Sequence, residues 1–135
     1  MQGDNIRTGQ AIFSKFPIIH RGEIEFPGSN NNVIFADIKM RRDTIRVYSI
    51  HLQSTKISPD IHEEIDEAKS KKIFRRVSEA FTEQQVQAEL IKEHKAECTY
   101  PMIICGDMNN SAFSYTYRTI KGSMKDTFEE AGSGF

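Results

Sequence analysis

The sequence predicts an α/β domain, and three observations support this class. Segments with a period of two in the first half indicate strands, and a helical period from about residue 60 indicates a long helix. An unbroken apolar run at residues 100–105 then indicates another strand. Strands on both sides of one helix favour a sheet that combines antiparallel and parallel pairing. Without internal repeats or low-complexity tracts, residues 1–135 read as a single domain.

Composition supports a folded chain and excludes several classes of protein. With 38% hydrophobic and 27% charged residues, the chain is too apolar to be disordered. No apolar run approaches the roughly 18 residues that cross a bilayer, and the first residues do not resemble a signal peptide. A net charge of −1 excludes bulk attraction to polyanions. Two cysteines, Cys98 and Cys105, are too few for a disulfide scaffold, and we expect two buried free thiols rather than a bridge.

Three segments of the first half are predicted strands. The first covers residues 10–14 and ends before Pro17, since proline cannot donate to a strand ladder. The second covers 32–40 and the third 44–52, both with alternating apolar residues. Because only residues 41–43 separate these two, they are predicted to form a hairpin.

The apolar spacing then predicts a helix over residues 60–96, either continuous or interrupted near 69–72. Pro59 and the capping-box pair Asp60 and Glu63 are typical of a helix start. Its expected core-facing residues are Phe74, Val77, Phe81, Ala88 and Ile91, with Gln84 as a polar exception.

Polar residues follow two of the predicted strands. Residues 106–109 (Gly-Asp-Met-Asn) come directly after the strand at 100–105, which is expected to be buried on both faces. His51 stands near the end of the strand at 44–52, where the helical connection begins. A strand–helix–strand crossover sets both strand ends at one sheet edge, so His51, Asp107 and Asn109 are candidate site residues. The alternatives are an Asx turn at residues 107–109 and an ordinary surface histidine.

Three signatures resemble those of the endonuclease/exonuclease/phosphatase superfamily, which includes pancreatic deoxyribonuclease, abasic-site endonucleases, sphingomyelinases and inositol-phosphate phosphatases. They are residues 14–18 (Ser-Lys-Phe-Pro-Ile), 50–54 (Ile-His-Leu-Gln-Ser) and 106–109. Their order matches the family, as does the long helix between the second and the third. Residues 115–118 and 125–128 resemble the helix and loop after the family's Asp-Asn turn. The resemblance covers almost the whole chain and is specific as a combination.

This resemblance implies a deoxyribonuclease-like four-layer fold, a two-sheet sandwich flanked by helices. It also implies hydrolysis of a phosphate ester with a divalent metal, usually magnesium, or manganese. Asp107 would orient or deprotonate the attacking water and, with Asn109, lie at the metal. Asn109 would also hold that water or a phosphate oxygen, and His51 would stabilise charge on the scissile phosphate. Such in-line attack requires an aligned water and neutralised phosphate oxygens.

The chain also departs from the family pattern. The family's site uses an upstream asparagine and metal-binding glutamate, a later aspartate and a terminal Asp-His pair, which have no counterparts here. Glu23 and Glu25 are in the wrong place for that glutamate. We therefore expect residues 1–135 to be the central part of an incomplete domain, inactive alone and with sheet edges open to association between copies. The substrate class stays open between nucleic acid, phospholipid headgroup and inositol phosphate.

Two other functions compete with hydrolysis. One is a non-catalytic member of the same fold that binds a partner or a phosphorylated ligand. The other is a zinc-binding structural module, although the spacing of His94, Cys98, Cys105 and Asp107 matches no regular zinc motif. The basic residues between 69 and 76 are interpreted as a solvated helix face rather than a nucleic-acid contact, and Asp126 as a capping or turn residue.

Overall fold

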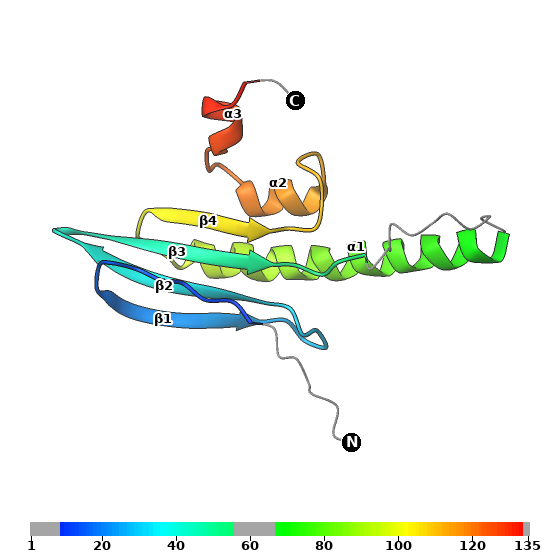
Figure 1. Ribbon diagram of the computed structural model, residues 1–135, viewed down its shortest axis with the longest axis horizontal. Coiled ribbons are helices and arrows are strands. Elements are labelled where there is room, and N and C mark those ends of the chain that lie inside the picture. The colour runs from blue at the N-terminus through cyan, green and yellow to red at the C-terminus, as the bar shows by residue number, and fades with distance from the viewer. Residues whose placement is uncertain (1–8, 56–66, 134–135) are drawn as a thin grey trace, which may run out of the picture.

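The computed structural model describes residues 9–55 and 67–133. Within these ranges the chain forms one four-stranded sheet and three helices (Figure 1). In chain order they are β1 Ile18–Glu25, β2 Asn32–Met40, β3 Asp43–His51, α1 Glu67–Ala96, β4 Met102–Asp107, α2 Tyr115–Lys121 and α3 Thr127–Ala131. The α/β class is confirmed, and these residues supply one sheet of the expected two-sheet sandwich. None of their helices has the length and hydrophobicity that spanning a bilayer requires.

The strand order is β1-β2-β3-β4. The first three strands pair antiparallel, whereas β4 returns after α1 and pairs parallel to β3. The carboxyl ends of β3 and β4 therefore meet at one edge of the sheet. Strands β1 and β4 are the outer strands, and association through their free edges stays a prediction.

The predicted hairpin of β2 and β3 is confirmed. Its ladder runs from Val33 opposite Ile50 to Met40 opposite Asp43, with a two-residue loop between. Arg41, the first loop residue, has a φ of 56°. This left-handed conformation matches the twist of a tight hairpin better than an ordinary turn does.

The first strand lies later in the chain than predicted. Residues 10–14 form no strand, and β1 begins at Ile18. Side chains rather than ladder bonds hold the earlier segment to the sheet, since Gln10 donates to the Asn32 carbonyl at 2.8 Å and accepts from Ser49 at 2.8 Å. Arg21, Glu23 and Glu25 share one face of β1, but the other face interrupts its isoleucines with His20 and Gly22, so the apolar alternation is too weak to predict the strand.

Helices α1 and α2 pack against one face of the sheet (Figure 1). The core between them contains Phe26, Val33, Phe35, Tyr48, Ile50, Leu52, Ala88, Ile91 and Ile120. The opposite face is more open, and Ile103 of β4 is 52% exposed there. The expectation that this strand is buried on both faces was wrong, because β4 is an edge strand with helices on one side only.

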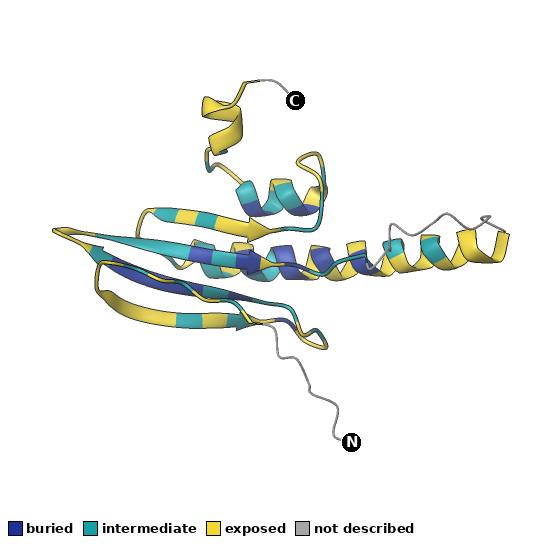
Figure 2. Ribbon diagram, viewed as in Figure 1, coloured by how far each residue is buried: buried dark blue, intermediate teal, exposed yellow. Residues whose placement is uncertain are grey.

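Helix α1 is continuous through residues 69–72. Its predicted start and the capping box at Asp60 and Glu63 lie outside the described residues. The half from Ala80 onward packs on the sheet, whereas the preceding half extends beyond it and is mainly exposed (Figure 2). Phe74 and Phe81 are therefore 76% and 43% exposed, contrary to the prediction that both belong to the core. The basic residues between 69 and 76 are exposed, as predicted.

A buried ion pair joins β2 and β3 away from the carboxyl edge. Asp37, only 3% exposed, accepts two hydrogen bonds from the Arg46 guanidinium, at 2.6 Å from Nε and 2.8 Å from Nη2. His20 contacts the same carboxylate at 3.2 Å, and the Phe35 ring lies 4.5 Å from the Arg46 guanidinium. The hydrogen bonds from Arg46 outweigh burial and lower the pKa of Asp37, so the ionised form is the stable one.

We expect Asp37→Asn to lower the free energy of unfolding at pH 7 by about 3 kcal/mol, because it leaves the Arg46 charge buried without a counter-charge. A carboxylate whose pKa is lowered by folding stabilises above its usual pKa of 3.8, and this contribution is lost as pH falls through the folded value. Urea unfolding at pH 7 and near pH 3 should therefore show the difference shrinking in acid. The exposed Asp43→Asn is the control, and equal stability of both variants at pH 7 would contradict the interpretation.

Candidate active site

His51 and Asp107 are neighbours at the carboxyl edge of the sheet. His51 is the last residue of β3 and Asp107 the last of β4, and the parallel ladder pairs them directly. Side chains of directly paired residues project from the same face of a sheet. Both residues are exposed, so the structure places an imidazole and a carboxylate next to each other and open to a ligand.

Gly106 allows the two strands to approach closely at this point. Its φ is +133°, a conformation that side chains rarely adopt. A Cβ here would lie 2.0 Å from the Ile50 carbonyl oxygen and 2.7 Å from its nitrogen. The absence of a side chain at Gly106 is therefore a requirement of the ladder that pairs His51 with Asp107.

Asp107 and Asn109 form the turn that the sequence left open as an alternative. The Asn109 amide donates to Asp107 Oδ1 at 2.7 Å, and Asn109 has a φ of 49°. Its side-chain Nδ2 donates to the Leu52 carbonyl at 2.9 Å, which ties the turn to the end of β3. The second carboxylate oxygen of Asp107 accepts no hydrogen bond from the described residues and is available to a ligand.

Further amide side chains, which the sequence did not indicate as site residues, bind the backbone at the same edge of the sheet. Asn31 donates to the carbonyls of His51 and Leu52 at 3.1 and 2.7 Å. Gln87 of α1 accepts from the Gln53 amide at 3.0 Å. Asn31 carries no sequence signal beyond its polar loop, because its partners are backbone atoms some twenty residues away.

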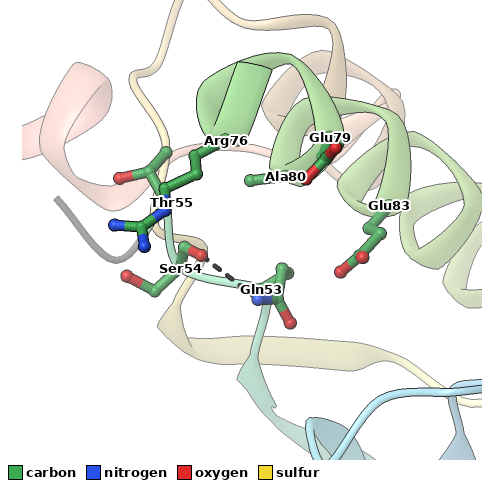
Figure 3. Close-up of a pocket in the computed structure, with 7 residues that line it drawn as sticks. All are labelled: Gln53, Ser54, Thr55, Arg76, Glu79, Ala80 and Glu83. Atoms are coloured by element: carbon green, nitrogen blue, oxygen red, sulfur yellow. Dashed lines mark hydrogen bonds between the residues drawn. The ribbon is translucent and has the colours of Figure 1, made fainter. Parts of the chain in front are cut away.

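A pocket of about 270 Å³ lies between residues 53–55 and helix α1 (Figure 3). Figure 3 shows the Arg76 side chain beside Thr55, while Glu79 and Glu83 approach from the helix. Arg76 has no ion-pair partner among the described residues. The pocket adjoins the segment that follows His51, and its lining is polar and of mixed charge.

The candidate residues do not by themselves complete a magnesium site. Magnesium prefers nearly octahedral coordination by oxygen atoms and gives up its waters reluctantly. Asp107 supplies one carboxylate, and Asn109, whose NH₂ group donates to the Leu52 carbonyl, can add only one amide oxygen. Among residues 9–55 and 67–133, no three His, Cys, Asp or Glu side chains gather closely enough to hold a metal ion.

In the described part of the chain, no group of three or more His, Cys, Asp or Glu side chains could bind the zinc ion of the alternative function. His94 instead meets the Tyr48 hydroxyl at 3.0 Å and packs its ring 4.7 Å from that of Phe35. Burial lowers the pKa of His94, which favours a neutral ring in this core position. Cys98 and Cys105 are free, as predicted, but they are half-buried and exposed rather than buried.

The structure confirms the predicted capping role of Asp126. It is the N-cap of α3, and its carboxylate accepts from the amides of Phe128 and Glu129 at 2.7 and 3.4 Å. Tyr117 also donates to this carboxylate. These local hydrogen bonds give Asp126 a structural role at the start of α3.

Comparisons with known proteins give no family assignment. No family model matches the chain, and neither does any curated protein. Three solved structures are similar over 82% of the chain. SmcL has 17% sequence identity and a TM-score of 0.48. A beta toxin from Staphylococcus aureus has 18% identity and a TM-score of 0.47, and a sphingomyelinase C from Streptomyces griseocarneus has 18% identity and a TM-score of 0.44. The chain spans only 36–37% of their lengths. Similarity at this level assigns neither a family nor an activity.

Proposed function

We propose that the intact protein is a metal-dependent phosphoester hydrolase and that His51, Asp107 and Asn109 belong to its active site. The observation that carries the proposal is the direct pairing of His51 with Asp107 across the β3–β4 ladder. Two of the three superfamily-like signatures, residues 50–54 and 106–109, contain these residues, and the resemblance implies catalytic roles for them. The ligands that complete the metal site would come from outside the described residues.

The proposed chemistry is attack of water on phosphorus. Asp107 accepts a hydrogen bond from the water through its available oxygen and takes up the proton as the new phosphorus–oxygen bond forms. His51 donates to a phosphate oxygen as the bond from phosphorus to the leaving oxygen breaks, and that oxygen takes a proton from a solvent water to leave as an alcohol. Asn109 holds the attacking water or another phosphate oxygen. A divalent metal would supply further charge neutralisation.

The substrate is proposed only as a phosphate ester. Nucleic acid, phospholipid headgroup and inositol phosphate share this chemistry. One of the structurally similar proteins is named a sphingomyelinase, which acts on a phospholipid. Testing the intact protein on abasic DNA, plasmid, sphingomyelin and bis-p-nitrophenyl phosphate separates the classes. Saturable binding of a phosphorylated ligand without turnover of any of them would favour the non-catalytic alternative.

On its own, the 135-residue chain is expected to hydrolyse bis-p-nitrophenyl phosphate no faster than background in magnesium or manganese. The reason is that its described residues contain no cluster able to hold the metal. Losing one preorganised catalytic group typically costs on the order of a hundredfold in rate, and hydrolysis of a phosphate ester requires several such groups. The assay compares the chain with its Asp107→Ala variant. Turnover above background that disappears in the variant would show that the chain is sufficient.

A further inference from the structure

The polar exception on helix α1, Gln84, is fully buried. Its Nε2 donates to the Gln53 carbonyl at 2.6 Å and to the Asn109 carbonyl at 3.2 Å. Its Oε1 accepts from Asn110 Nδ2 at 2.6 Å. Both donor hydrogens and the acceptor of one buried amide are therefore used on backbone and side-chain partners in two different segments.

These two segments carry the candidate active site. Gln53 follows His51 by two residues, and Asn109 follows Asp107 by two residues. Beyond the paired residues two hydrogen bonds join these segments directly: the Leu52 amide donates to the Asp107 carbonyl at 3.0 Å, and Asn109 Nδ2 donates to the Leu52 carbonyl at 2.9 Å. Gln84 thus joins the segments after β3 and β4 just where the ladder ends.

We propose that Gln84 is a positioning residue for the His51–Asp107 site, an inference that rests on the proposed function. Its amide fixes the separation of the segments after β3 and β4, and so keeps the imidazole and the carboxylate in register. An apolar side chain of similar size would leave two carbonyls and one amide without partners in a dry environment. The segments would then move apart locally while the β2–β3 hairpin stays intact.

Gln87 provides a matched control. It is also buried, at 2% exposed, and lies three residues along the same helix, but of the two segments it hydrogen-bonds only to the one after β3, through the Gln53 amide. Gln84→Met and Gln87→Met therefore remove the same chemical group from similar surroundings. Only the first removes a side chain of α1 that hydrogen-bonds to both segments.

Amide hydrogen exchange, measured by NMR on the full 135-residue chain, tests the positioning role directly. In Gln84→Met, exchange at Leu52 and Asn109 should rise about tenfold more than exchange in the β2–β3 ladder, because local opening is separable from global unfolding. In Gln87→Met, the Asn109 amide should change no more than that ladder. A uniform rise across the sheet in Gln84→Met, or the same local pattern in Gln87→Met, would overturn the proposal.

If Gln84→Met does not fold, Asn110→Ala carries the test, since it removes only the contact to Gln84 Oε1. Exchange at Asn109 should then rise about threefold relative to the β2–β3 ladder, and an unchanged ratio would overturn the proposal. In the intact protein, Gln84→Met should lower kcat about tenfold with KM nearly unchanged, as expected for misplaced catalytic groups. An inactive intact wild type would refute the proposed function, whereas the exchange ratios would still decide the positioning role.

Discussion

Asp107→Asn should lower kcat/KM of the intact protein for its phosphate ester by about a thousandfold, the scale on which essential charged groups act. The substitution is nearly isosteric. An asparagine oxygen can still accept from the Asn109 amide, so the turn that now uses Asp107 Oδ1 is retained. What is lost is the negative charge and the ability to take a proton from water. The kinetic loss therefore reports on chemistry rather than on folding.

Asp126→Asn is the matched control for this substitution. Asp126 also accepts backbone hydrogen bonds at a turn, but it caps α3 and contacts neither His51 nor Asp107. Its variant should retain activity within about threefold of the wild type, the range expected for a residue outside the site. If Asp107→Asn also remained within that range, Asp107 would have no catalytic part.

The paired strand ends could be predicted because their signals are local in the sequence. Alternation predicted the hairpin, and a helical connection followed by an apolar run predicted the return of β4 parallel to β3. That topology alone places His51 and Asp107 at one edge. Asn109 was placed in the same turn by its two-residue spacing from Asp107.

Other features depend on partners distant in the sequence. Periodicity identifies the apolar face of α1 but not how far the sheet extends beneath it, so Phe74 was assigned to the core although it is 76% exposed. Gln84 broke the apolar stripe, yet only the folded chain shows its partners, 25 to 31 residues away. Strand β1 was missed because it is a mostly exposed edge strand, so its sequence carries only a weak apolar alternation and its pairing with β2 decides the structure.

Gly106→Ala is expected to reduce the free energy of unfolding by at least about 4 kcal/mol, among the largest effects of a single substitution. Two costs combine at this position. The φ of +133° is unfavourable for any side chain, and the added Cβ would lie 2.0 Å from the Ile50 carbonyl oxygen. Because that oxygen belongs to the backbone of β3, the clash can be relieved only by separating β4 from β3.

Gly28→Ala separates the two costs, because Gly28 has a φ of +73° but its added Cβ would meet nothing within 4 Å. We expect this control to lose only about 1 kcal/mol, the usual conformational cost. Urea unfolding of both variants measures the difference, and the exchange rate of the Leu52 amide shows whether β4 has moved. If Gly106→Ala proved no less stable than Gly28→Ala, the close approach of the strands could not be what holds His51 beside Asp107.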